Sequence, residues 1–234
     1  MTFKNKTILI TGAAGNLGRA VANAFHQQGA NLVLLDRQMD SLQRGFGKED
    51  DHRAFFAVDL LNQAQVKDAV ESSIHRFGRI DVLCNVAGGF RMGPPVHETP
   101  DEDWNFLFDL NTRSLLHAVR AVVPGMLASD GGKIVNIAAN SAQKGVANMG
   151  AYCASKDVVI RITEAMAAEL RDSNINVNCV MPSIIDTPEN RAAMPNADFS
   201  RWVAPEALAD VIVFLASDGA RAIHGAALPV VGRS

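Results

Sequence analysis

The chain has a single tyrosine and only three cysteines in 234 residues. The cysteines, Cys84, Cys153 and Cys179, are odd in number, widely spaced and embedded in apolar segments. A disulfide framework or a cysteine metal cluster needs closely patterned cysteines. We therefore expect reduced thiols in a core.

Long runs of one residue type are also missing. No apolar stretch reaches the roughly 18 residues of a membrane span, and no signal-peptide core precedes the first apolar segment. The 22 basic and 25 acidic residues are interspersed and give a net charge of -3. These features predict a cytoplasmic protein that has no membrane or nucleic-acid partner.

Short β-branched runs alternate with amphipathic segments along the whole chain, which is 48% hydrophobic. This alternation predicts an α/β, single-domain Rossmann fold over residues 1–234, a doubly wound parallel sheet of about seven strands with helices on both faces. The expected strands are 7–11, 31–35, 54–58, 82–85, 133–138, 176–180 and 227–231, and the expected helices are 17–28, 63–77, 101–127, 151–172 and 205–216. Residues 183–204 form the longest irregular stretch, which we interpret as a substrate-binding loop.

A glycine-rich turn follows the first predicted strand and opens the first predicted helix. Gly12 allows a tight turn, Gly15 lets the backbone approach a pyrophosphate, and Gly18 permits close helix packing. Asn16 and Leu17 complete the turn. Its position between strand and helix predicts dinucleotide binding, and an ordinary connecting turn is the alternative.

An acidic residue, Asp36, ends the second predicted strand. A carboxylate there accepts hydrogen bonds from ribose hydroxyls and repels a 2′-phosphate, so NAD is favoured over NADP. Arg37 weakens this preference because a guanidinium could bind that phosphate. Asp59, followed by Leu60, is either an adenine contact or a helix N-cap.

The only tyrosine, Tyr152, precedes Lys156 by four residues in a helical pattern. Residues at this spacing share a helix face, and a neighbouring ammonium lowers the pKa of a phenol. Tyr152 is therefore a candidate general acid or base, and a buried tyrosine beside a solvated lysine is the alternative.

Taken together, the motifs resemble those of the short-chain dehydrogenase/reductase family over essentially the whole chain. The matching positions, in order, are the glycine turn, Asp36, Asp59, Asn85-Val86-Ala87-Gly88, Asn111, Tyr152 with Lys156, and Pro182. The resemblance implies hydride transfer between the nicotinamide of the cofactor and a small-molecule substrate, with which Tyr152 exchanges a proton. It also implies that Lys156 lowers the phenol pKa and holds the nicotinamide ribose, while Asn111 holds a water. Further cofactor contacts are implied at Asn85, Ala87, Gly88, Pro182, Ile185 and Thr187.

Three departures from the family pattern stand out. The middle glycine is Gly15 where the family has it at the position of Asn16, and Ser183 follows Pro182 in place of glycine. The position of the catalytic serine, 13 residues before the tyrosine, is Ala139. Ser141 is the nearest hydroxyl, but two residues of extended chain span about 6–7 Å, so it replaces that serine only with a local bulge.

Several of these departures are similar to one branch of the family, the quinonoid dihydropteridine reductases, as is the segment 186–202. An electron-poor dihydropterin spreads charge over its rings, so the missing serine donor is dispensable for such a substrate. We expect Phe90, Phe199 and Trp202 to form the walls of a pocket for a flat heterocycle, and Arg191 to hydrogen-bond its polar edge. Core aromatics and a solvated arginine are the alternative.

Two other functions stay open. One is a 3-oxoacyl or ketone reductase, or the reverse alcohol dehydrogenase, using Ser141 or no serine. The other is a non-catalytic NAD-binding sensor or scaffold. Because the family usually dimerises through helices corresponding to 101–127 and 151–172, we expect a homodimer or homotetramer.

Overall fold

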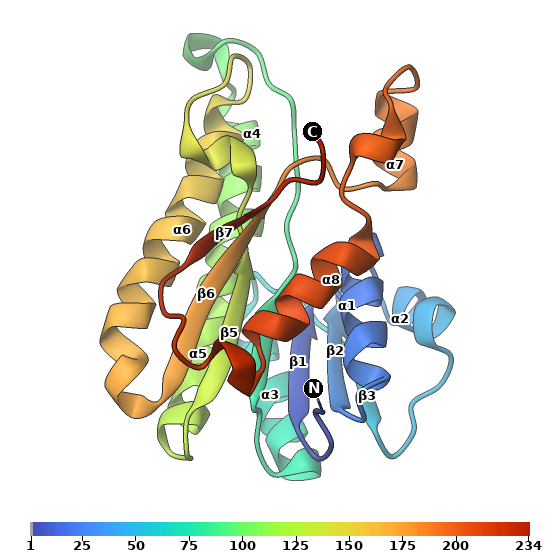
Figure 1. Ribbon diagram of the computed structural model, residues 1–234, viewed down its shortest axis with the longest axis vertical. Coiled ribbons are helices and arrows are strands. Elements are labelled where there is room, and N and C mark those ends of the chain that lie inside the picture. The colour runs from blue at the N-terminus through green and yellow to red at the C-terminus, as the bar shows by residue number, and fades with distance from the viewer. Residues whose placement is uncertain (1) are drawn as a thin grey trace.

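A computed structural model describes residues 2–234. Seven parallel strands form one sheet in the order β3-β2-β1-β4-β5-β6-β7. The strands are β1 (Thr7–Thr11), β2 (Asn31–Asp36), β3 (Arg53–Ala57), β4 (Val82–Asn85), β5 (Gly132–Ile137), β6 (Ile175–Pro182) and β7 (Ala227–Val230). The predicted α/β Rossmann fold is confirmed, and each strand lies within two residues of its predicted bounds (Figure 1).

Eight α-helices accompany the strands within residues 2–234. They are α1 (Asn16–His26), α2 (Met39–Phe46), α3 (Gln63–Phe77), α4 (Asp101–Phe108), α5 (Ser114–Leu127), α6 (Gly150–Leu170), α7 (Pro188–Ala193) and α8 (Pro205–Leu215). Helices α2 and α7 were not predicted. The single helix expected over 101–127 is instead α4 and α5, joined by a π-helical turn at Asp109–Arg113.

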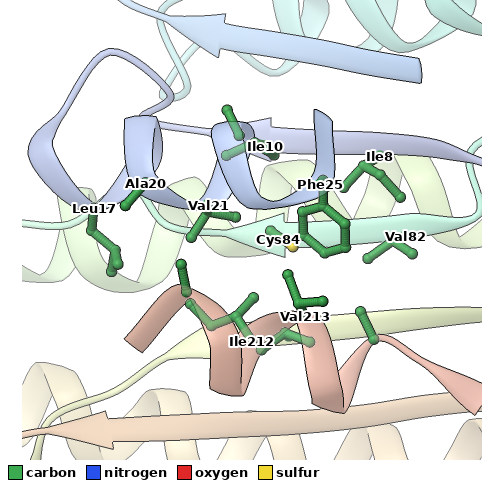
Figure 2. Close-up of a cluster of buried hydrophobic side chains, with 14 of the residues drawn as sticks. Ile8, Ile10, Leu17, Ala20, Val21, Phe25, Val82, Cys84, Ile212 and Val213 are labelled. Atoms are coloured by element: carbon green, nitrogen blue, oxygen red, sulfur yellow. The ribbon is translucent and has the colours of Figure 1, made fainter. Parts of the chain in front are cut away.

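The helices cover both faces of the sheet and enclose two hydrophobic clusters. Alternation along β1 sends Ile8 and Ile10 into one cluster and Leu9 into the other. In the first cluster, Phe25 of α1 and Ile212 of α8 pack over β1 and β4 (Figure 2). The second cluster joins α3, α5 and α6 to the opposite face. Within residues 2–234, no helix is long and apolar enough to cross a membrane.

The strand order reverses between β1 and β4, which are neighbours in the sheet. In such sheets the loops on either side of the reversal diverge and leave a crevice at the carboxyl ends of the strands. The segments that follow β1, β2, β4, β5 and β6 all reach this crevice. Helix α7 lies over the same edge of the sheet (Figure 1). This arrangement brings the residues of the sequence motifs together at the carboxyl ends of the strands.

Candidate active site

The turn after β1 is built so that only glycine fits at two of its positions. Gly12 has φ +64°, and a Cβ there would lie 2.8 Å from the Cα of Ala87. A Cβ on Gly18 would clash with the carbonyl of Gly12. Gly15, the N-cap of α1, makes no side-chain cap, and the first helical turn holds no acidic residue. The free amides at this helix end suit the pyrophosphate of a dinucleotide.

The carboxylate of Asp36 is held facing this turn. Its Oδ2 accepts a hydrogen bond from the Ala14 amide at 2.9 Å, and its Oδ1 accepts one from the Arg37 amide at 2.8 Å. Arg37 also lines the cleft. The side chain that suits ribose hydroxyls is thus fixed by the backbone, whereas no such bond fixes the Arg37 guanidinium within residues 2–234.

The loop after β3 lies farther along the same cleft and includes Asp59 and Leu60. The N-cap of α3 is Asn62, so the alternative of Asp59 as the helix N-cap is wrong. Asp59 instead accepts a hydrogen bond from the Leu61 amide at 3.0 Å. His117 supports this loop, since its Nδ1 lies 2.8 Å from the Leu60 carbonyl oxygen, and no sequence motif pointed to that contact.

The segment after β4 joins the cofactor turn to the candidate catalytic residues. Thr11 Oγ1 accepts hydrogen bonds from the amides of Val86 and Ala87 at 3.1 and 3.2 Å. A Cβ on Gly88 would lie 2.9 Å from Lys156 Nζ and 3.0 Å from Asn111 Oδ1. Glycine at this position therefore lets the backbone run directly beside both functional side chains.

Lys156 is 5% exposed, and its Nζ donates a hydrogen bond to the Ile137 carbonyl at 2.9 Å. Burial lowers its pKa to about 8. Burial also raises the pKa of Tyr152 to about 12. The predicted lowering of the phenol pKa by Lys156 is therefore wrong, because burial has the larger effect and raises it. Phe90 packs edge-on against the Tyr152 ring, with centroids 4.9 Å apart.

Asn111 lies in the π-helical turn between α4 and α5, a feature often found at functional sites. Its Oδ1 accepts a hydrogen bond from the Gly89 amide at 2.8 Å. Its Nδ2 donates to the Gly89 carbonyl and to Ser155 Oγ, both at 3.0 Å. These bonds hold the segment after β4 against α6, so Asn111 positions the wall of the cleft; the water it is expected to hold stays a prediction.

Ala139, at the position of the family serine, is buried, has an extended backbone and lines the cleft. Ser141 also lines the cleft, from the 3₁₀ turn at Asn140–Gln143. A hydroxyl therefore exists on this wall, at a different chain position from the usual one.

Three residues predicted to bind substrate do not line the cleft. Arg191 pairs with Asp186 through two bonds of 2.6 and 2.7 Å, and its guanidinium lies over the Phe199 ring. Phe199 in turn packs on Trp202, which is buried. The wall predicted from Arg191, Phe199 and Trp202 is thus not assembled beside Tyr152, and of the predicted aromatic residues only Phe90 reaches the cleft.

Helix α7 is tied to the cofactor turn by side chains that the sequence motifs did not identify as partners. Glu189 of α7 accepts a hydrogen bond from Asn16 Nδ2 at 2.8 Å, and Asn16 Oδ1 accepts one from Arg19 at 3.0 Å. Thr187 caps α7 through the Asn190 amide. The residue that replaces the usual glycine thus connects the two walls of the cleft.

The cleft has a volume of about 1510 Å³, larger than the roughly 300–1,000 Å³ of common small-molecule sites, so a dinucleotide and a substrate both fit. The predicted site residues that line it are Gly12, Gly15, Asn16, Leu17, Asp36, Arg37, Asp59, Leu60, Ala87, Gly88, Phe90, Ala139, Ser141, Tyr152, Lys156, Pro182, Ile185 and Thr187. The predicted residues Gly18, Asn85 and Asn111 do not line the cleft themselves. Within residues 2–234, no group of His, Cys, Asp and Glu is arranged to hold a metal ion.

Known proteins are similar to this chain over nearly its whole length. Residues 6–198 match the family model for short chain dehydrogenase. The chain is 33% identical over 247 residues to the 3-oxoacyl-[acyl-carrier-protein] reductase FabG of Thermotoga maritima, across 99% of this chain and 98% of that protein. It is 34% identical over 241 residues to a D-threitol dehydrogenase of Mycolicibacterium smegmatis, across 97% and 92% of the two chains.

Solved structures with bound cofactor are also similar. Carveol dehydrogenase from Mycobacterium avium in complex with NAD has a TM-score of 0.90 at 28% identity, covering 98% of this chain and 97% of that one. ElxO with NADP bound has a TM-score of 0.90 at 26% identity, covering 97% of each chain. None of these four relatives supports the narrower resemblance to dihydropteridine reductases. The chain belongs to the short-chain dehydrogenase/reductase family, as an NAD(P)-dependent oxidoreductase.

Proposed function

We propose that this protein uses NADH to reduce the carbonyl group of a small organic molecule, with Tyr152 as the proton donor. The observation that carries the proposal is the geometry of the cleft, which is lined by Tyr152, Lys156 and the glycine turn together. Burial, which raises the pKa of Tyr152 to about 12, supports it. A phenol that keeps its proton at neutral pH serves as a general acid. The reverse reaction needs the phenolate, so reduction is the favoured direction.

Different residues along the cleft bind the cofactor and transfer the proton. The amides at the start of α1 hold the pyrophosphate, and Asp36 accepts hydrogen bonds from ribose hydroxyls. The bound nicotinamide supplies the hydride. Tyr152 gives its proton to the substrate oxygen, and the charged form of Lys156 stabilises the phenolate that is left. That charged form dominates below about pH 8, the pKa of Lys156.

NADH is proposed over NADPH because the Asp36 carboxylate, held by two amides, repels a 2′-phosphate. Arg37 at the same end of the cleft is the group that favours the opposite choice. Solved relatives bind either cofactor, so the preference rests on these two side chains.

Ketones or 3-oxoacyl compounds are the proposed substrates because the similar proteins are named as a 3-oxoacyl-[acyl-carrier-protein] reductase, a D-threitol dehydrogenase and a carveol dehydrogenase. A quinonoid dihydropterin is the second candidate, favoured by one observation: the buried Ala139 leaves the usual donor position without a hydroxyl. A non-catalytic scaffold has no need of both Tyr152 and Lys156, which argues against that function.

The test is NADH oxidation by the purified protein with a panel of a β-ketoacyl thioester, a cyclic ketone and quinonoid dihydropterin. Tyr152→Phe should lower the turnover of the preferred substrate by about 10²- to 10⁴-fold, the usual contribution of a general acid. Full activity in Tyr152→Phe contradicts the proposed proton donor, and turnover of the pterin alone selects the second candidate.

We also infer a homodimer or homotetramer. Apolar side chains remain exposed on α4 and α5, with Trp104 at 44% and Leu127 at 49%. Light scattering of the purified protein gives the mass directly, and a monomer at micromolar concentration contradicts this inference.

A further inference from the structure

The half of the cleft beside Tyr152 is the part left for the substrate. The ends of β1, β2 and β3 carry the glycine turn, Asp36 and Asp59, which suit the cofactor. The segments after β4, β5 and β6 supply the other half. Its apolar lining includes Phe90, Met92, Phe106, Met149, Ile184 and Met194. Flexible methionine side chains adapt to varied apolar shapes, so this half fits a substrate with an apolar body.

No acidic side chain of the described segments after β5 and β6 lines the cleft; Asp186 and Glu189 lie in the second segment but are bonded to Arg191 and Asn16. The aspartates lining the cleft are Asp36, Asp59 and Asp109, and no glutamate lines it. Asp36 and Asp59 lie in the cofactor half, and Asp109 pairs with Arg113 at 2.8 Å. Negative charge on a substrate therefore meets no free carboxylate side chain on these two walls.

Arg91 and Arg191 are chain neighbours of residues that line this half of the cleft, Lys156 lines it, and all three cations are engaged. Arg91 pairs with Asp103 at 2.5 Å, Arg191 pairs with Asp186, and Lys156 is buried against the Ile137 carbonyl. Lys144 is exposed, lines the cleft, and makes no hydrogen bond or ion pair within residues 2–234. It is the cation that is free to meet a substrate.

Polar groups next to Lys144 in the chain strengthen this assignment. Asn140 and Ser141 line the same cleft wall. Asn140 Oδ1 accepts a hydrogen bond from Gln143 at 2.6 Å, and this leaves the Asn140 Nδ2 group without a partner in the described part of the chain. An ammonium, an amide and a hydroxyl from one short segment are the donors that an oxyanion uses.

We propose that Lys144 binds an anionic group on the substrate, so that the preferred carbonyl compounds join an apolar body to a carboxylate or a phosphate. This inference rests on the proposed carbonyl reduction and names the substrate class for the same cleft. Arg191, which the sequence predicted to bind the polar edge of a heterocycle, is paired with Asp186 and leaves Lys144 as the available cation.

The test compares ketones that end in a carboxylate with their methyl esters, over a series of chain lengths, and includes one ketone ending in a phosphate. The ratio of kcat/KM between acid and ester is the readout, because it cancels losses common to both substrates. We expect the wild type to favour the acid by about tenfold at the best length, and this preference to weaken in high salt.

Variants of Lys144 distinguish the effect of its charge on this ratio from the effect of a disturbed structure. Lys144→Gln should bring the ratio close to one, Lys144→Glu should reverse it, and Lys144→Arg should keep it. Lys48→Gln removes the same charge from a residue outside the cleft and should leave the ratio as in the wild type. A wild-type ratio near one, or a preference that survives Lys144→Gln, overturns the proposal. A preference for the phosphate over the carboxylate identifies which anion is used.

Binding provides a measurement that does not depend on turnover. Titration calorimetry compares an unreactive saturated carboxylic acid with its methyl ester on the NADH-loaded protein. Tighter binding of the acid that disappears in Lys144→Gln supports the anion site even if no ketone is reduced, in which case the proposed reaction alone fails. Equal binding of acid and ester to the wild type overturns the anion site.

Discussion

Burial of the Lys156 ammonium gives the fold a specific dependence on pH. The lysine is 5% exposed, and burial lowers its pKa from an ordinary value of 10.5 to about 8. Since one pKa unit corresponds to about 1.4 kcal/mol, the charged form costs the folded state up to about 3 kcal/mol at neutral pH. Replacing Lys156 with methionine, which keeps the length and removes the charge, should therefore stabilise the protein at pH 7 while abolishing activity.

The sign of this pH dependence follows from the number of protons that the folded and the unfolded chain bind. Below about pH 8 the lysine is protonated in both the folded and the unfolded chain, so the full cost is present. Between about pH 8 and pH 10.5 the unfolded chain holds a proton that the folded chain has released, so the contribution to stability rises with pH. The advantage of Lys156→Met should therefore shrink across this window and vanish near its upper end.

Urea denaturation of cofactor-free protein, followed by tryptophan fluorescence between about pH 7 and pH 10, measures this difference. The contribution of Tyr152, whose pKa is raised by burial and by Cys153, occurs in both proteins and cancels in the comparison. Cys179 interacts with Lys156, so Cys179→Ala is introduced into both proteins to remove its contribution. Lys156→Arg should remain destabilised at every pH, because a guanidinium keeps its charge. If Lys156→Met is less stable than the wild type at pH 7, with a difference that does not change with pH, the assigned cost of burial is wrong.

Further outcomes concern the reaction and its cofactor. Ala139→Ser should raise kcat/KM for ketone reduction at least tenfold if the wild-type site lacks an oxyanion donor; no gain means that another group already supplies it. Asp36→Ala should shift the ratio of kcat/KM for NADH to that for NADPH by about tenfold toward NADPH, and an unchanged ratio contradicts the role of the carboxylate. The rate of reduction should fall above about pH 8 as Lys156 loses its charge, and a flat profile up to pH 10 argues against its stabilising the phenolate. Asn16→Ala and Glu189→Ala should each raise the Kd of NADH about two- to fivefold, with no further rise in the double variant; additive effects would mean that the two residues act separately.

The sequence predicted the strands well because each is a buried, β-branched run, and it predicted the glycine turn because the constraint there is local. It did not predict α2, in which Met39, Leu42 and Phe46 recur at i, i+3 and i+7 and pack on the core, because an eight-residue helix offers too few repeats for this periodicity to stand out. It also missed the π-helical turn, since one extra residue per turn leaves no compositional trace.

At the site, the sequence identified which residues gather and was less successful with their partners. Arg191 was predicted to bind substrate because nothing in the chain pattern shows that Asp186 folds back on it with two hydrogen bonds. Spacing placed Lys156 on the same helix face as Tyr152, but its ammonium turns to the Ile137 carbonyl. Tyr152 and Lys156 do line the same cleft, so only the partners of Lys156 and Arg191 were missed; these are tertiary contacts of long polar side chains, whose direction the backbone pattern does not fix.

The edge-on contact between Phe90 and Tyr152 makes the active site observable by spectroscopy. Phe90 is 51% exposed and lies on the wall of the cleft, so a ligand entering beside Tyr152 must pass or displace its ring. Because the chain has no other tyrosine, the phenol signal in near-ultraviolet circular dichroism or in ring-labelled NMR comes from this one residue. Binding of cofactor and of substrate can thus be followed separately, in solution, on an unmodified protein and at the reacting group itself.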